Sequence, residues 1–220
     1  MESSETAGGD GSGSLEVRPP LQRRSREAWQ RVLDAGVALL EEGGYEAFTI
    51  ASVCARARVA PRALYARVDN KDALFLAVYE HGMARIRLDH AVFADEARWR
   101  RLPAREVATQ AVREVAGIFD RHAALVRAVV LISGGHPEVH RRGARYSREL
   151  GDLFTELLLR APGEIDHPAP EAAVRAAFDV VFSSLVLRTA YGPSFTMPAA
   201  DEEQFREQLT EMVRRYLYAP

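Results

Sequence analysis

Apolar residues recur at helical spacing along most of the chain. In the first such segment, from about residue 25 to 43, the apolar side chains follow the i, i+3, i+4, i+7 spacing of an amphipathic helix: Trp29, Val32, Leu33, Val37 and Leu40. Ser25 is a suitable N-cap, and Gly43-Gly44 is a stop signal. The pattern predicts an amphipathic helix with one buried face.

Three further helices are predicted after this one. Thr49 is placed to cap a helix that runs to about Ala57. Pro61, a residue favoured in the first turn of a helix, opens a third helix of about two turns that ends at Arg67 or Val68. Asn70 is placed to cap a fourth helix.

The remaining apolar segments also have a helical period. They predict helices over 103–121, 123–132, 137–160, 171–191 and 201–218. We find no period-2 strand and no repeat of 20 to 50 residues in the sequence. The fold class predicted from the pattern is therefore all-α.

Changes in composition divide the chain into three parts. Residues 1–22 are rich in Gly, Ser and Glu and end near Pro19-Pro20, which is typical of a disordered arm. Residues 23–70 hold the first three helices. Residues 71–220 form the larger helical region.

Composition and charge narrow the function classes. The 220 residues are 47% hydrophobic and 27% charged, as in ordinary globular proteins, and no apolar run approaches the roughly 18 residues that span a bilayer. The acidic N-terminus is unlike a signal peptide, and the single cysteine fits a reducing compartment, so we expect a cytoplasmic protein with no membrane contact.

Positive charge is concentrated near the N-terminus. The formal net charge of the chain is −2, yet residues 15–71 hold ten basic and seven acidic residues. Residues 50–71 contain one acidic residue, Asp69, and five basic residues: Arg56, Arg58, Arg62, Arg67 and Lys71. If the chain binds a nucleic acid, the positive charge that attracts the phosphates would therefore come from the region of the short helices.

The same region resembles the TetR family of transcriptional regulators. The family signature places Gly-Tyr or Gly-Phe before a Thr, then a small-residue helix, a turn, Leu-Tyr and Lys-x-x-Leu. This chain has the matching residues in register: Gly44-Tyr45, Thr49, Val53, Ala57, Val59, Leu64-Tyr65, Lys71 and Leu74. The resemblance covers about residues 28–78. It implies an N-terminal three-helix helix-turn-helix DNA-binding domain and a C-terminal helical domain for ligand binding and dimerisation.

Three positions depart from the family pattern. Arg58 stands where a turn glycine is usual, so a left-handed backbone there would cost on the order of 1 kcal/mol. Ala60 replaces the usual Ser cap, and Arg67-Val68 replaces a His-Phe pair.

Matching positions give the expected DNA contacts. Thr49, Tyr65 and Lys71 would contact phosphates. Arg62 would contact a base edge, because Arg can pair bidentately with guanine. Pro61 and Ala63 would meet thymine methyl groups, and Arg67 would contact the DNA backbone.

Other basic residues have two interpretations. Arg56 and Arg58 are either DNA contacts or solvated surface. Arg23, Arg24 and Arg26 are either an arm that follows the minor groove or a solvated charge cluster.

The resemblance also implies partners for the larger region. The last two helices are expected to form a homodimer interface, so that two DNA-binding domains meet a palindromic operator. The middle helices are expected to enclose a small-molecule effector, against the alternative that the same residues are plain core. The candidate lining residues are Phe119, Val126, Arg127, Tyr146, Phe154, Phe178 and Phe182. Arg127 and Arg188 lie in very apolar helices, and each either binds an anionic ligand or is explained by partial exposure or an ion pair with Asp179 or Glu149.

Catalytic signatures are weak by comparison. His136 and His140 have an i, i+4 spacing that can bind zinc, but a third ligand is missing and a polar helix start is the simpler interpretation. Cys54 fits a packing role. We expect no enzyme activity, no metal and no cofactor.

The sequence therefore predicts a repressor that an effector releases from its operator. The alternatives are an all-α dimeric ligand-binding or scaffold protein with an inactive DNA head, and a small helical enzyme. Steep salt dependence of DNA affinity would distinguish the regulator from the scaffold.

Overall fold

The computed structural model describes residues 23–161, 165–195 and 201–218, and these residues form helices and connecting turns with no strand among them. The expected arm at residues 1–22 lies outside the described residues. The all-α prediction is confirmed.

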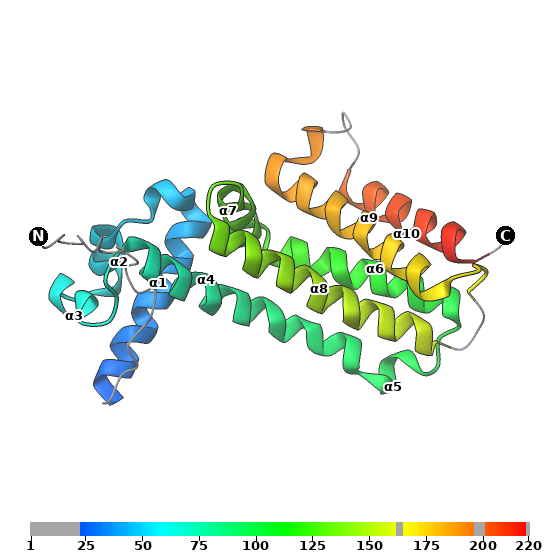
Figure 1. Ribbon diagram of the computed structural model, residues 1–220, viewed down its shortest axis with the longest axis horizontal. Helices are drawn as coiled ribbons and strands as arrows, with labels where there is room; N and C mark the ends of the chain where they lie inside the picture. The colour runs from blue at the N-terminus through cyan, green and yellow to red at the C-terminus, as the bar shows by residue number, and fades with distance from the viewer. Residues whose placement is uncertain (1–22, 162–164, 196–200, 219–220) are drawn as a thin grey trace, which may run out of the picture.

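The N-terminal unit, called the head below, consists of α1 (Arg23–Ala47), α2 (Ile50–Ala57) and α3 (Pro61–Tyr65). It lies at one end of the molecule (Figure 1). The break predicted at Gly43-Gly44 is real, because Gly44 takes φ 63°, ψ −159° inside α1. Helix α3 ends earlier than predicted, at Tyr65, although the Val68 N–H still donates to the Leu64 carbonyl at 3.1 Å.

Helix α4 (Lys71–Leu88) runs from the head into the larger unit, called the body below (Figure 1). The rest of the body consists of the 3₁₀ turn η1 (Asp89–Ala94), α5 (Glu96–Trp99), α6 (Ala104–Arg121), α7 (Ala123–Ser133), α8 (Pro137–Arg160), α9 (Pro170–Tyr191), the 3₁₀ turn η2 (Pro193–Phe195) and α10 (Glu202–Leu217). The pattern missed η1 and α5.

Close packing joins the head to the body. A Cβ added to Gly36 in α1 would lie 2.4 Å from a Val78 methyl in α4, so these helices touch where no side chain fits between them. A Cβ added to Gly82 in α4 would likewise lie 2.6 Å from Leu125 in α7. Helix α7 also packs against α1. Both α4 and α7 therefore contact the head directly.

Candidate nucleic-acid interface and ligand cavity

The start of α2 is fixed by a local cap, as predicted. Thr49 has an extended backbone, and the Ser52 N–H donates to its Oγ1 at 3.0 Å. The Thr49 side chain is exposed on the outside of the head, and the Ser52 hydroxyl lies 2.7 Å from the same Oγ1. The cap places an exposed hydroxyl at the N-terminus of a helix, where the free N–H groups favour anions.

The turn between α2 and α3 contains a strained residue. Arg58 has φ 54° and ψ 50°, the only positive φ of a non-glycine residue in the described part of the chain. The Val59 N–H donates to the Cys54 carbonyl at 3.1 Å and closes the end of α2. The left-handed conformation expected where Arg58 replaces glycine is therefore present.

A small apolar core holds α2 against α3. Val53, Cys54, Ala57 and Leu64 are all buried. The packing role predicted for Cys54 fits this position, and burial raises the pKa of its thiol. The inward position of Leu64 directs the opposite side of α3 away from the protein.

That outward side of α3 is exposed. Pro61, Arg62 and Ala63 are exposed, and Tyr65 is 52% exposed. Within the described residues, no ion pair or hydrogen bond engages the Arg62 guanidinium. The helix therefore presents one available guanidinium among small side chains and a tyrosine.

Two cations at the edge of this surface are held by the protein itself. Arg67 donates to the Ser25 carbonyl at 3.2 Å and to the Ser25 hydroxyl, and its guanidinium lies 5.4 Å from the Trp29 ring centroid. Lys71 donates to the Tyr45 carbonyl at 3.4 Å, and its Nζ lies 3.7 Å from the Tyr45 ring centroid. Both side chains are half-buried, so each is positioned by α1.

The remaining basic residues of the head differ from one another. Arg56 forms two hydrogen bonds of 2.5 Å to the Glu42 carboxylate, and the pKa of Glu42 is lowered by them. Arg23 pairs with Glu27 at 2.9 Å. Arg58 is exposed. These contacts favour a structural role for Arg56, and they leave the Arg58 guanidinium facing solvent.

A cavity of about 230 Å³ lies in the body between α4, α6, α7, α8 and α9. Four of the seven residues expected to surround a ligand line it: Phe119, Val126, Tyr146 and Phe182. Sequence reasoning missed Tyr79 and Met83 on α4, Val129 and Val130 on α7, and His140 and Ser147 on α8. On a helix, residues that pack in the core and residues that line a cavity have the same apolar spacing, so the sequence does not distinguish them.

The other three candidates lie elsewhere. The rings of Phe154 and Phe178 pack at a tilted angle with centroids 5.5 Å apart, and the Phe178 centroid lies 5.5 Å from that of Phe182, so the first two are core behind the cavity. Arg127 is exposed on α7 and lines a separate surface hollow that also includes Arg188.

Partial exposure, one of the interpretations given for these arginines, applies to Arg127, whereas Arg188 forms an ion pair with a partner other than Asp179 or Glu149. Arg188 pairs with Glu202 at 3.1 Å and lies 4.4 Å from the Phe205 ring centroid. Glu149 instead accepts a hydrogen bond from Arg87 at 3.1 Å. Sequence spacing could not identify partners that the fold brings together from distant helices.

Polar groups are few around the cavity. The Tyr146 hydroxyl lies 3.1 Å from His90 Nε2, and burial lowers the pKa of His90 and raises that of Tyr146. Burial also raises the pKa of Tyr79 to about 12, and its hydroxyl is buried without a hydrogen-bond partner among the described residues. At neutral pH these three groups are uncharged, so the cavity suits an apolar molecule.

The outward face of α9 and α10 exposes a different kind of surface. Val180, Met212 and Tyr216 are 40 to 47% exposed and line a hollow of about 270 Å³ between the two helices. Figure 1 shows the two helices side by side along one edge of the body.

The two histidines considered for zinc have other positions. His136 caps α8, where its Nδ1 accepts the Val139 N–H at 3.4 Å. His140 lines the cavity. Over the described ranges, no three His, Cys, Asp or Glu side chains come close enough to hold a metal ion. None of the helices described is both long and apolar enough to cross a bilayer.

Comparison with known proteins covers most of the chain. A family model described as "Bacterial regulatory proteins, tetR family" matches residues 32–78, and one described as "Tetracyclin repressor-like, C-terminal domain" matches residues 103–217. No curated protein matches the sequence.

Solved structures share the fold at low sequence identity. A putative TetR-family regulator from Mesorhizobium loti is 13% identical, with a TM-score of 0.66 over 89% of this chain and 97% of that one. A transcriptional regulator from Rhodococcus sp. RHA1 is 15% identical, with a TM-score of 0.63 over 85% and 94%. FadR from Bacillus subtilis, in complex with stearoyl-CoA, is 14% identical, with a TM-score of 0.59 over 86% and 100%.

Proposed function

The chain belongs to the TetR family of DNA-binding transcriptional regulators, and we propose that it is a repressor. It binds a palindromic operator as a homodimer and is released when a small apolar molecule enters the cavity between α4, α7 and α8. The expected cytoplasmic location stays a prediction, and we propose no catalytic activity.

The observation that carries the proposal is the exposed side of α3. Its surface of Pro61, Arg62 and Ala63 is narrow enough for a major groove about 12 Å wide. We assign Arg62 to a base edge, because its guanidinium is available and Arg pairs bidentately with guanine. Pro61 and Ala63 would contact thymine methyl groups.

Phosphate contacts would surround this surface. The Thr49 hydroxyl and the exposed Tyr65 hydroxyl would donate to phosphate oxygens, and Lys71 would add a charge from the start of α4. Arg67 donates to Ser25 on α1, so we assign it mainly to positioning the end of α3. Its contribution to DNA binding would then be indirect.

The dimer would form through the outward face of α9 and α10. Val180, Met212 and Tyr216 are large apolar side chains whose exposure is costly in a monomer and useful in an interface. Two heads held at a fixed distance would meet two half-sites about one helical turn apart.

Release would pass through α4 and α7. Met83 on α4 and Val130 on α7 line the cavity, and both helices also pack against α1 of the head. A ligand larger than the empty cavity would displace α4 and α7 together, because the two helices pack closely at Gly82 and Leu125. The spacing of the two heads then changes.

Selection of bound duplexes from a random pool tests the DNA-binding proposal. We expect a palindromic consensus whose affinity falls steeply as salt rises, because phosphate contacts release counterions. A protein with an inactive head would enrich no sequence and would show weak, salt-insensitive binding.

Release is tested with a pair of cavity variants. Small apolar compounds are screened for those that displace the selected duplex. Val130→Phe fills the cavity and should abolish the response of the protein to an active compound. Leu131→Phe makes a similar change at the neighbouring position, which is 51% exposed, and should respond normally. An equal response of both variants would contradict the proposed effector site.

A further inference from the structure

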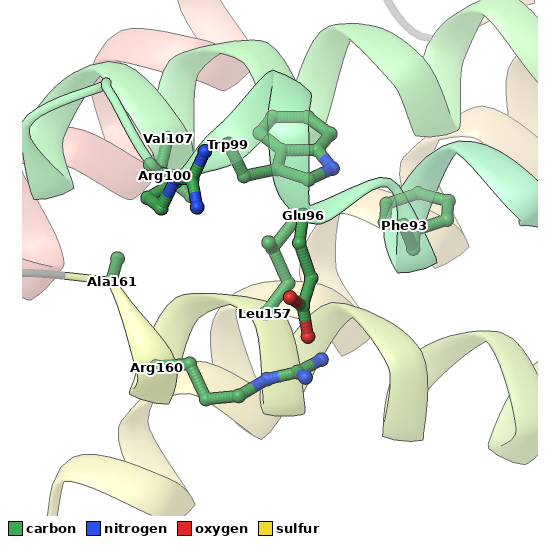
Figure 2. Close-up of a pocket in the computed structure, with 8 residues that line it drawn as sticks. All are labelled: Phe93, Glu96, Trp99, Arg100, Val107, Leu157, Arg160 and Ala161. Atoms are coloured by element: carbon green, nitrogen blue, oxygen red, sulfur yellow. The ribbon is translucent and has the colours of Figure 1, made fainter.

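A second hollow lies at the end of the body far from the head. It has a volume of about 340 Å³ and is enclosed by η1, α5, α6 and the end of α8 (Figures 1 and 2). No residue that lines it also lines the cavity between α4 and α7. Along α6, Val107 in the hollow and Ile118 in the other cavity are about 16 Å apart at 1.5 Å per residue.

The inner wall of the hollow is apolar and fixed in place. Phe93, Trp99, Val107 and Leu157 line it, and each is at most 5% exposed. The Trp99 indole N–H donates to the Val92 carbonyl at 2.6 Å, which holds the ring against the hollow. Each of these side chains therefore exposes only a small apolar area to the hollow, and this area is fixed in place for contact with an alkyl chain or a flat ring.

The outer part of the hollow carries charge. Arg100 follows α5 and Arg160 ends α8, and both are exposed and line the hollow with Glu96. Figure 2 shows the Glu96 carboxylate directed toward Arg160, with Arg100 beside Trp99 and Val107. Two guanidiniums and the Glu96 carboxylate therefore lie beside an apolar interior, and the Glu156 carboxylate lies 3.9 Å from Arg160.

The guanidiniums have donors to spare. The Arg100 guanidinium forms no ion pair or hydrogen bond with another residue in the described ranges. Arg160 uses its Nε to donate to the Glu156 carbonyl at 3.1 Å, and one terminal nitrogen lies 3.9 Å from the Glu156 carboxylate. Its remaining N–H groups are available to an anion.

We propose that this hollow binds a monocarboxylate whose apolar chain or ring rests on Trp99, Phe93 and Leu157. Its carboxylate accepts hydrogen bonds from Arg100 and Arg160, which are stronger than neutral ones because both partners are charged. The site is additional to the effector cavity proposed above and does not depend on DNA binding.

Octanoate is the probe for this site. In a Trp29→Phe background Trp99 is the only tryptophan, so its fluorescence reports binding, and calorimetry measures the affinity independently. We expect saturable binding of octanoate, binding at least about tenfold weaker for octan-1-ol, and none for octylamine. From hexanoate to decanoate, affinity should rise about fourfold per methylene until the hollow is full.

Variants locate the bound probe. Arg100→Gln and Arg160→Gln should each weaken octanoate binding at least about tenfold, while Arg101→Gln, an exposed neighbour outside the hollow, should bind as the parent does. Val130→Phe in the other cavity should leave the affinity unchanged. The proposal is overturned if neither method detects saturable binding or if Val130→Phe blocks binding. It is also overturned if a variant that combines Arg100→Gln with Arg160→Gln binds octanoate as well as the parent does.

Discussion

The head and the body expose surfaces of opposite chemistry. On α3, the exposed residues include Arg62 and Tyr65 beside small side chains. On α9 and α10, the exposed residues include the large apolar side chains of Val180, Met212 and Tyr216. The first surface suits a polyanion with narrow grooves, and the second suits a matching apolar surface on another copy of the chain. Under the proposed function, one molecule would carry separate surfaces for DNA and for a second copy of the chain.

The two regions also differ in the contacts that stabilise them. The head is stabilised by polar and cation–ring contacts, such as the Thr49 cap and the contact of Tyr45 with Lys71 of α4, around a small core. The body depends on long helices and on aromatic packing such as that of Phe154 with Phe178. Single substitutions should consequently separate the functions of the two regions.

The largest effect is expected from breaking the body surface with Val180→Asp. A charge at this half-exposed position should prevent dimerisation by desolvation and repulsion between copies. Loss of the second head should lower affinity for the selected duplex by on the order of 100-fold. Light scattering gives the mass, and fluorescence anisotropy gives the DNA affinity.

Leu88→Asp is the matched control for Val180→Asp. Leu88 is 75% exposed at the end of α4, away from the α9 and α10 face, so its variant should remain dimeric. A dimeric Val180→Asp protein that still binds the duplex would show that the interface lies elsewhere.

A smaller effect is expected from overpacking the head with Gly36→Ala. The added methyl would lie 2.4 Å from a methyl of Val78, a side chain that is stiff at χ1, and 3.1 Å from Phe48. Overpacking should outweigh the gain in helix propensity and lower the free energy of unfolding by about 1–2 kcal/mol. Urea unfolding followed by circular dichroism measures the change.

The same substitution in the body should act in the opposite direction. Gly143 lies inside α8, and a Cβ there would meet nothing within 4 Å. Gly143→Ala should therefore raise the free energy of unfolding by up to about 1 kcal/mol. Equal changes in the free energy of unfolding for the two variants would contradict the claim that close packing of α1 on α4 leaves no room for a methyl group at Gly36.

The smallest effect is expected at the turn of the head, with Arg58→Gly. Glycine adopts φ 54° without the steric cost that Arg58 has, so the variant should be more stable by about 1 kcal/mol. Ala66→Gly is the control, because Ala66 has φ −63° and glycine there should only lose stability. Thermal unfolding should show shifts of the melting temperature of opposite sign for the two variants. A destabilised Arg58→Gly protein would contradict the backbone strain at Arg58.

Much of the head could be predicted from the sequence because its geometry is set by neighbours in the chain. Thr49 and Asn70 cap their helices through the N–H three residues later, and Pro61 starts α3, as their positions predict. The contacts of Arg67 with Ser25 and Trp29 were not predicted, because they join residues about 40 positions apart. The sequence thus locates the exposed surface of α3, but it does not show which protein groups each basic side chain contacts.

The body could be predicted only as helices. The bounds of α8 match its pattern, but apolar periodicity does not say which side chains surround empty space, so the pattern does not distinguish Phe154 and Phe178 in the core from residues that line the cavity. Helix α5 is a single turn and has no period to detect, although the Asp95 cap is a local signal for it. The hollow beside Trp99 was missed for the same reason.

The most direct test of the account compares Arg62→Ala with Lys71→Ala in anisotropy titrations against the selected duplex and a scrambled one. Arg62→Ala should lose about 1–3 kcal/mol of affinity for the selected duplex and little for the scrambled one, because it removes a base contact. Lys71→Ala should weaken binding to both alike and reduce the salt slope by about one. Equal losses on both duplexes for Arg62→Ala would contradict the claim that α3 recognises sequence through this side chain.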